Sequence, residues 1–224
     1  MSHTPDFPTA SGPIELVGPA GRIEAYCELP RPEDARRAVA VVCHPHPPDG
    51  GTMDNKVVTT ITRALSELGI ASLRFNFRGV GASEGEYDAG RGETLDLLAV
   101  AQWAIARCPG DAFWLGGFSF GAWVALRAAR QLPVKQMVCI APPVGFRDFT
   151  GVPPPPCPWL VVQGEADDVV DPQAVFDWVA AAENPPTLVR MQEAGHFFHR
   201  RLVDLRGAIR NGVAKPLPPL RRQA

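Results

Sequence analysis

Short apolar runs alternate with longer amphipathic runs along most of the chain. Residues 38–43 are apolar without interruption and rich in β-branched side chains, which is typical of a strand buried on both faces of a sheet. Residues 55–68 instead place apolar side chains every three or four positions, which predicts a helix, and Gly69 follows where that helix would end. The pattern predicts a chain that builds a sheet and returns to it through helices.

Strand-like and helix-like patterns also occur before residue 38 and after residue 69. Residues 14–17 and 22–29 surround a Gly-Pro-Ala-Gly turn, which predicts an antiparallel hairpin at the start of the sheet. Further strands are expected at residues 70–75, 112–115, 135–141, 159–163 and 187–191, and further helices at residues 94–107, 122–131, 172–182 and 200–211. Because strands alternate with helices, we predict an α/β fold with a mostly parallel central sheet and helices on both faces.

The length of the chain and its proline-rich stretches bound the domain organisation. A chain of 224 residues with 46% hydrophobic content can build one sizeable core, and we expect one α/β domain over residues 13–213. Residues 1–12 are expected to be poorly ordered. Residues 214–224 form a tail with a P-x-x-P-x-R pattern, which is expected to be solvated, and whether it binds anything is left open. Seven prolines in residues 142–158 predict an extended loop rather than a second domain.

Charge and cysteine content narrow the class of partner. The 22 basic and 24 acidic residues give a formal net charge of −2, which does not indicate nucleic acid or an anionic membrane as a partner. A small-molecule substrate is expected, and the oligomeric state is left open. With no apolar run of membrane-spanning length and no signal-like start, we expect a cytoplasmic protein. The odd count of five cysteines at irregular spacing predicts buried, reduced thiols rather than disulfides.

A serine stands at a predicted corner between a strand and a helix. Residues 112–115 resemble a strand and residues 122–131 a helix, so the chain turns sharply near Ser119. Gly117 and Gly121 flank the serine two positions away on each side, which permits a strained turn without a clash of side chains. This G-x-S-x-G pattern is that of a nucleophile elbow.

A serine hydroxyl is a weak nucleophile at neutral pH, so it requires a general base and a carboxylate that orients the base. Asp167, Asp168 and Asp171 follow the predicted strand at residues 159–163, and His196 follows the last predicted strand. The resulting order of serine, aspartate and histidine along the chain is that of the α/β hydrolases. Each candidate lies just past a strand end, so a parallel sheet would gather them on one rim.

Six motifs are spread over nearly the whole chain. They are His44-Pro-His46-Pro, Gly50-Gly-Thr-Met-Asp-Asn-Lys56, Phe75-Asn-Phe-Arg-Gly-Val-Gly-Ala-Ser-Glu84, Gly117-Phe-Ser-Phe-Gly121, Gly164-Glu-Ala-Asp167 and Gly195-His-Phe-Phe-His199. Together they resemble the α/β-hydrolase superfamily, and more closely its small, lidless serine hydrolases of predicted esterase type. The resemblance implies an α/β-hydrolase fold without a cap domain, and an enzyme that works without a cofactor.

The resemblance also assigns residues to roles. In that family the acid lies three residues after the glycine of the turn after the seventh strand, which implies Asp167, with Asp168 as its rival and Asp171 as a helix-capping residue. Ser119 is then the nucleophile and His196 the base. The oxyanion hole takes one backbone N–H from the residue after the nucleophile, Phe120. The resemblance implies the N–H of His46 as the second donor, with its imidazole free to line the pocket.

Two features invite other interpretations. His44 and His46 form an H-x-H pair like those that open metallohydrolase sites, but no H-x-D-H string follows and prolines stiffen the pair, so we expect no metal. Residues 76–85 are glycine-rich, yet they match neither the Walker pattern nor G-x-G-x-x-G. We expect a structural turn there rather than a phosphate loop.

These observations predict a serine hydrolase that cleaves a carboxylic ester or thioester through an acyl-enzyme on Ser119, with His196 as base and Asp167 as orienting acid. Amidase, peptidase or acyltransferase activity would use the same residues. A non-catalytic binding protein of the same fold is the alternative from a different class. The sequence does not identify the physiological substrate.

Access to the serine follows from the missing cap. Residues 142–158 are too short and too proline-rich to form cap helices, so we expect Ser119 to be open to solvent and the substrates to be short, soluble esters. The alternative is a deep acyl tunnel with aromatic walls. Its walls would be Phe118, Phe120, Phe146, Phe149, Phe197 and Phe198.

Overall fold

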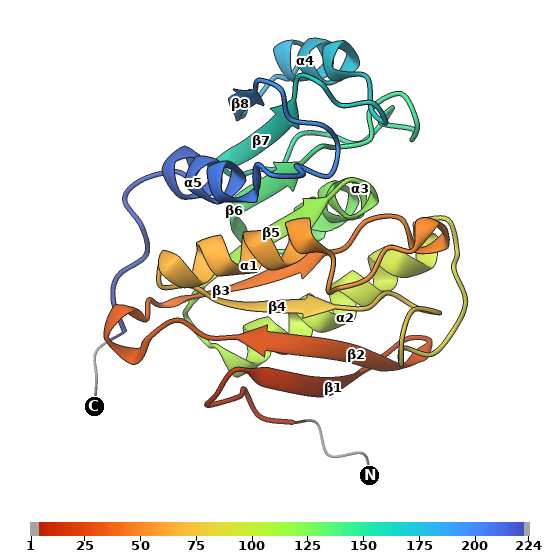
Figure 1. Ribbon diagram of the computed structural model, residues 1–224. Coiled ribbons are helices and arrows are strands. Elements are labelled where there is room, and N and C mark those ends of the chain that lie inside the picture. The colour runs from red at the N-terminus through yellow and green to blue at the C-terminus, as the bar shows by residue number, and fades with distance from the viewer. Residues whose placement is uncertain (1–4, 222–224) are drawn as a thin grey trace.

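The computed structural model describes residues 5–221, which form an eight-stranded sheet between two layers of helices (Figure 1). The strands are β1 (Gly12–Gly18), β2 (Gly21–Glu28), β3 (Ala38–Cys43), β4 (Ala71–Phe75), β5 (Ala112–Phe118), β6 (Val134–Ile140), β7 (Trp159–Gly164) and β8 (Thr187–Met191). The helices are α1 (Lys56–Glu67), α2 (Arg91–Arg107), α3 (Phe120–Ala128), α4 (Pro172–Ala180) and α5 (Leu202–Gly212).

The sheet has the order β1-β2-β4-β3-β5-β6-β7-β8. The pairs β1·β2 and β2·β4 are antiparallel, and every pair from β4·β3 to β7·β8 is parallel. The predicted N-terminal hairpin and the mostly parallel sheet are therefore confirmed. The carboxyl ends of β3 to β8 lie along one edge, where a parallel sheet places its ligands.

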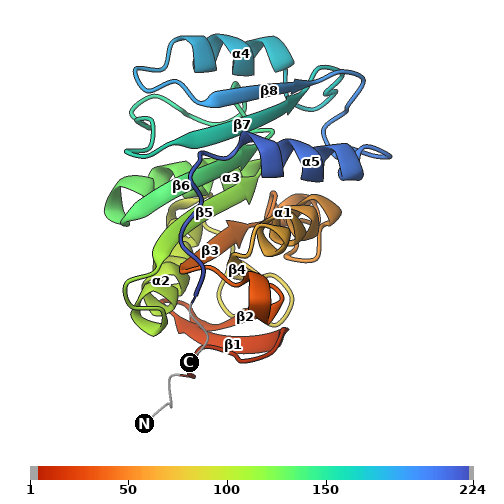
Figure 2. The ribbon, with the colours of Figure 1, turned by 90° about the vertical axis from the view of Figure 1, so that its left-hand side faces the viewer.

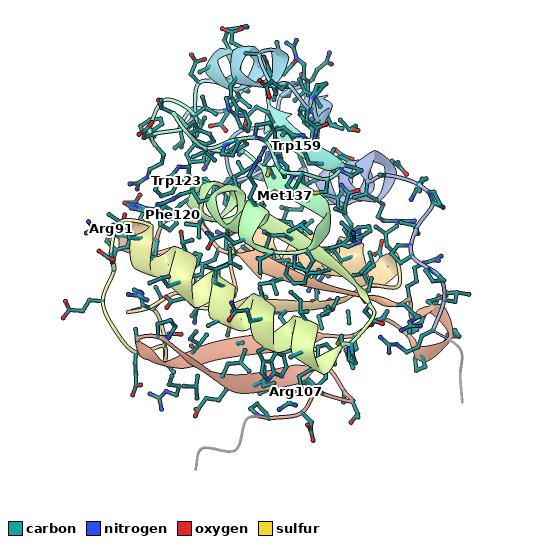
Figure 3. All side chains as sticks on the ribbon, turned by 180° about the vertical axis from the view of Figure 1, so that it is seen from behind. Arg91, Arg107, Phe120, Trp123, Met137 and Trp159 are labelled. Atoms are coloured by element: carbon teal, nitrogen blue, oxygen red, sulfur yellow. The ribbon has the colours of Figure 1, made fainter. Side chains whose placement is uncertain are left out.

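The sheet divides the hydrophobic core into two halves, and helices cover each half. Figure 2 shows α1 and α5 on one side of the sheet and α2 and α3 on the other, and Figure 3 shows the α2 and α3 side. Val57, Ile61, Leu205 and Ile209 pack on the first face. On the second face, α2 and α3 cover β3, β5 and β6, and α4 packs against β7. Because both faces are covered, β3 is buried along its whole length, as its uninterrupted apolar run predicts.

Helix α2 begins three residues before its predicted start at residue 94, and the cause is a local cap. The carboxylate of Glu93 accepts the N–H of Asp88 at 2.8 Å and that of Gly90 at 2.6 Å. Gly90 adopts a φ of 93°, which a glycine reaches without strain. These bonds satisfy N–H groups ahead of the helix, so the first turn forms within a glycine-rich stretch that hides the helical period.

The connection between β6 and β7, residues 141–158, contains no helix, which confirms the prediction that the fold carries no cap domain. The indole N–H of Trp123 donates to the carbonyl of Asp148 at 3.0 Å and holds this loop, called the β6–β7 loop below, against α3. The loop therefore packs on α3 near the carboxyl edge of the sheet.

Within residues 5–221 all five cysteines are buried and unpaired, as predicted, and burial raises the pKa of the Cys108 thiol to about 11.

Phe7 stacks on Trp103, and Arg221 donates its backbone N–H to Ala35, so the described parts of both terminal segments contact the domain. The order of residues 1–4 and 222–224, which belong to the predicted terminal segments, lies outside the described residues. No helix in the described part of the chain has the length and apolar character needed to cross a lipid bilayer.

Candidate active site

The corner between β5 and α3 holds Ser119 in a strained conformation, with φ 51° and ψ −121°. A side chain on Gly117 would meet the backbone of Gly121 at 2.4 Å, and one on Gly121 would meet the carbonyl of Cys43 at 2.4 Å. Backbone contacts therefore leave no room for a side chain at either position. The local sequence G-x-S-x-G permits the sharp turn that presents the serine at the carboxyl edge of the sheet.

The structure brings Ser119, His196 and Asp167 together from three different loops. The Nε2 atom of His196 lies 3.1 Å from the Oγ atom of Ser119, and its Nδ1 atom lies 2.9 Å from Oδ2 of Asp167. Since an ionised carboxylate only accepts hydrogen bonds, Nδ1 carries the proton and donates it to Asp167. Nε2 of the neutral ring then accepts the hydroxyl proton of Ser119. This is the arrangement of a nucleophile, a base and an orienting acid.

Asp167 is held by groups that favour its charged form. Its Oδ1 atom accepts the N–H groups of Val169 at 2.9 Å and Val170 at 2.8 Å. The amide of Gln163 donates to Oδ2 at 2.8 Å, beside the bond from His196. Burial by itself raises the pKa of the Asp167 carboxyl, but the hydrogen bonds from His196 and from the two backbone N–H groups outweigh it and lower the pKa.

The rival carboxylates lie elsewhere. The side chain of Asp168 is exposed and makes no hydrogen bond with His196. Asp171 caps α4, where its carboxylate accepts the N–H of Gln173 at 3.0 Å. The structure thus places Asp167 against the histidine and Asp171 in the capping position expected from the sequence.

The loops after β7 and β8 are joined by their backbones. Glu165 donates its N–H to Met191 at 2.9 Å, and Ala166 donates to Ala194 at 3.1 Å. A side chain on Gly164 would meet the carbonyl of Ala194 at 2.1 Å, so glycine is needed where the two loops approach. The loop contacts therefore set the distance between Asp167 and His196.

Two aromatic rings bracket the imidazole of His196. The ring of Phe118 lies 5.1 Å from it in the core, and the ring of Phe197 lies 5.1 Å away at a right angle. Only 3% of His196 is exposed, while 43% of Phe197 is exposed. Phe197 therefore shields the imidazole of His196 from water on its outer side.

On the opposite side of the elbow lie the two candidate oxyanion donors. Phe120 is the first residue of α3, a position whose N–H has no intrahelical partner. His46 follows β3, and its N–H has no acceptor within residues 5–221. The rings of His46 and Phe120 are 5.3 Å apart, so the two residues are neighbours as the sequence interpretation requires.

The imidazole of His46 is not free to line a pocket, contrary to the expectation from sequence. Its Nδ1 lies 2.7 Å from Oδ2 of Asp49, and its Nε2 lies 2.9 Å from the hydroxyl of Tyr87. Both ring nitrogens are occupied, which fixes the loop after β3 and with it the backbone N–H of His46.

His44 is an internal support. Its Nδ1–H donates to the carbonyl of Pro45 at 2.7 Å, and its Nε2 accepts the N–H of Phe77 at 3.0 Å. Burial lowers the pKa of His44 from the ordinary value of 6.5 to about 4, against the opposing effect of the bond to Pro45. The neutral ring ties the loop after β3 to the loop after β4.

The two histidines of the H-x-H pair therefore have other partners than a metal. Among residues 5–221, no group of three or more histidine, cysteine, aspartate or glutamate side chains is arranged to hold a metal ion. The glycine-rich residues 76–85 are a structural turn, as predicted. The carboxylate of Glu24 accepts the side-chain amide of Asn76 at 2.7 Å and the N–H of Ala82 at 2.8 Å.

Ser119 was expected to be open to solvent, and this expectation is wrong, since only 9% of the residue is exposed. Its backbone lies inside the elbow, where its N–H donates to the carbonyl of Ile140 and its carbonyl accepts the N–H groups of Ala122 and Trp123. The six phenylalanines of the alternative acyl tunnel differ in burial. Three are core residues, Phe149 packs on Trp178, and Phe146 and Phe197 are 67% and 43% exposed. The core residues are Phe118, Phe120 and Phe198.

Sequence reasoning missed two residues of this region. Gln163 is fully buried inside an apolar strand, and a polar residue in such a run was a visible sign of a buried partner. Tyr87 gave no comparable signal, since it contacts His46 only because two loops 41 residues apart meet in space.

The chain resembles proteins of one family over most of its length. Residues 48–156 match the family model of the alpha/beta hydrolase fold. An uncharacterized protein of Rickettsia prowazekii is 35% identical over 207 residues, which span 88% of this chain and 86% of that protein.

Two solved structures are close in both sequence and fold. A lidless α/β serine hydrolase from Xanthomonas campestris is 53% identical with a TM-score of 0.90, over 93% of this chain and 96% of that one. An α/β serine hydrolase homologue from Coxiella burnetii is 41% identical with a TM-score of 0.89, over 93% of this chain and 100% of that one.

Proposed function

Because the chain belongs to the α/β serine hydrolases, we propose that it hydrolyses short carboxylic esters or thioesters through an acyl-enzyme on Ser119. The observation that carries the proposal is the position of His196, whose two ring nitrogens lie within hydrogen-bond distance of Ser119 and Asp167. A serine paired in this way with a neutral, oriented imidazole is an activated nucleophile.

In the first half of the reaction, Oγ of Ser119 attacks the carbonyl carbon while Nε2 of His196 takes the hydroxyl proton. The carbonyl oxygen becomes an oxyanion, which the N–H groups of Phe120 and His46 stabilise. The positive charge on the imidazolium is balanced by Asp167 next to it. The bond to the leaving group then breaks, and His196 gives its proton to the departing alcohol or thiol.

In the second half, water replaces the leaving group. Nε2 of His196 accepts a proton from water, whose oxygen attacks the acyl carbon of the Ser119 ester. The same N–H groups stabilise the second oxyanion. Collapse releases the carboxylic acid, and the proton returns from His196 to Oγ of Ser119, so the enzyme is restored.

The preference for short esters rests on the shape of the region. No cap covers Ser119, and three of the six phenylalanines that could form a tunnel are core residues. An acyl chain left in water forgoes about 0.8 kcal/mol of binding per methylene. Long chains therefore gain little over short ones.

A fluorophosphonate probe tests the nucleophile. We expect the probe to label the wild-type protein on the peptide that contains Ser119 and to leave Ser119→Ala unlabelled. Labelling of the Ser119→Ala protein at an equal rate would contradict the proposal, as would a folded wild-type protein that resists the probe. The second outcome would favour a non-catalytic binding protein.

A substrate series tests the reaction and the chain length. We expect kcat/KM for p-nitrophenyl esters to be highest from acetate to butyrate, and a thioester series to be cleaved by the same residues. A steep rise of kcat/KM towards about twelve carbons, as burial at about 0.8 kcal/mol per methylene would produce, would contradict the short-chain assignment. Turnover of anilides at a rate equal to that of esters would favour an amidase.

A further inference from the structure

We propose that Arg147, in the β6–β7 loop, selects substrates that carry a negatively charged group such as a second carboxylate. The proposal rests on the proposed esterase function, since it concerns which esters the Ser119 site prefers. It is carried by a half-buried guanidinium without an acidic partner, fixed beside the residues that hold the candidate oxyanion donors.

Three contacts fix the position of the guanidinium. Its central carbon lies 5.2 Å from the centre of the Phe120 ring and 5.6 Å from that of Trp123. Its Nη2 atom lies 3.4 Å from the hydroxyl of Tyr87. Stacking on aromatic faces uses the flat sides of a guanidinium and leaves N–H groups at its edge for a ligand.

Arg147 forms no ion pair with a carboxylate of the described residues. No carboxylate lies within 4.0 Å of its guanidinium in the part of the chain from residue 5 to residue 221. Three acids on the loops that carry His46, Tyr87 and Arg147 bond to other groups: Asp49 to His46, Asp88 to Arg91, and Asp148 to the N–H of Thr150. A half-buried cation without a counterion attracts an anion.

Arg147 contacts one candidate oxyanion donor, Phe120, and the hydrogen-bond partner of the other. Phe120, under the guanidinium, follows Ser119 in the chain and offers the first candidate N–H. Tyr87, at its edge, is hydrogen-bonded to His46, which offers the second. An ester bound with its carbonyl oxygen at these N–H groups therefore has Arg147 beside it, within reach of a group a few bonds from the reacting carbon.

A guanidinium suits a carboxylate because its N–H groups match the two oxygens. Phe146, next to Arg147, is 67% exposed and offers an apolar surface at the same loop. We therefore expect the preferred substrate to combine a short apolar segment with a terminal carboxylate, as in a monoester of a dicarboxylic acid.

The test compares matched charged and neutral esters. For the acyl side, the mono-p-nitrophenyl ester of glutaric acid is compared with p-nitrophenyl pentanoate. For the alcohol side, the butyrate ester of 4-hydroxybenzoate is compared with phenyl butyrate. Rates with Ser119→Ala are subtracted as background, since the glutarate ester also hydrolyses by itself.

We expect the wild type to prefer the charged ester on at least one side, and Arg147→Gln to lower that preference by about 10- to 100-fold, the effect of a lost charge-assisted hydrogen bond. The loss should appear mainly in KM, with Arg147→Lys intermediate. Arg127→Gln is the matched control, because Arg127 stacks 4.8 Å from the same Trp123 ring without touching Phe120. It should retain the wild-type preference.

Two results would overturn the proposal. One is a wild type that shows no preference for either charged ester. The other is an Arg147→Gln protein that loses activity equally on charged and neutral esters, which would make Arg147 a support for Tyr87. Failure of the esterase function itself is separate, because it would appear as absent fluorophosphonate labelling and no turnover of any ester.

Discussion

On one side of β5 the loops after β7 and β8 carry Asp167 and His196, and on the other side the loops after β3 and β4 carry His44, His46 and Tyr87. Both regions border the elbow, and both contain histidines with two occupied ring nitrogens. In the first region one ring nitrogen faces the hydroxyl of Ser119. In the second the ring nitrogens face only the protein's own loops.

The difference shows that the partner of each ring nitrogen decides what a histidine does. His196 bonds to a carboxylate on one side and to the hydroxyl of Ser119 on the other, so it is placed to accept the hydroxyl proton in the proposed reaction. His44 bonds to a carbonyl and a backbone N–H, so a proton on its second nitrogen would break a contact. We infer that one region supplies side-chain chemistry and the other supplies a backbone N–H held in place by side chains.

The largest expected effect lies in the first region. Ser119→Ala or His196→Ala should each lower kcat by roughly 10⁴- to 10⁶-fold, because the members of a triad act as a unit. Steady-state kinetics on p-nitrophenyl acetate, with circular dichroism to verify folding, measures this. Retention of substantial activity by a folded His196→Ala protein would remove the distinction between the two regions.

The acid is tested by two adjacent aspartates. Asp167→Asn should lower kcat by about 10⁴-fold, since an amide in place of the carboxylate disturbs the tautomer of His196. Asp168→Asn, at an exposed position, should leave kcat near the wild-type value. The kinetics of the two variants are measured side by side, and a reversed ranking would assign the acid to Asp168.

The second region is tested at His46 by separating side chain from backbone. Its φ of −55° suits proline, so His46→Pro can remove the N–H while keeping the backbone angle. We expect it to lower kcat by about 10²- to 10³-fold, the effect of losing one oxyanion donor.

The matched control is His46→Ala, which removes the ring and keeps the N–H. We expect a smaller loss of kcat, because only the bonds to Asp49 and Tyr87 disappear. Equal losses in the two variants would mean that the ring, rather than the backbone N–H, contributes to the reaction.

The smallest effect concerns stability at acid pH. The pKa of His44 in the folded protein, about 4, is below its unfolded value of 6.5, so the unfolded chain binds the proton first as pH falls. The free energy of unfolding should therefore fall from about pH 6.5 to about pH 4, by ~3 kcal/mol from this group, and fall no further from it below pH 4.

Urea unfolding of the wild type and of His44→Gln over this pH range measures the effect. The variant should be less stable at neutral pH, since it disturbs the bonds to Pro45 and Phe77, but its stability should depend less on pH. An equally steep loss of stability in both proteins would show that other groups cause the pH dependence.

Much of the fold was predictable because its signals are local. The β-branched run of β3 and the helical period of α1 indicate which of their residues are buried, and both elements form where the pattern predicts them. The start of α2 was not predictable from its period, since a carboxylate at Glu93 caps a glycine-rich turn. Gln163 was visible as a polar residue in an apolar strand, while the contacts of Tyr87 and Arg147 required loops that are distant in the chain.

The sequence by itself determined the order of strands and helices, the glycines that permit the turn at Ser119, and the succession of serine, aspartate and histidine. These depend on periodicity and steric demands over a few residues. Only the tertiary structure decided that Asp167 rather than its neighbour meets His196, that His44 is neutral, and that the ring of His46 is occupied. Those outcomes depend on which atoms meet across separate loops and on how much water is excluded around them. Both are set by residues that are far apart in the sequence.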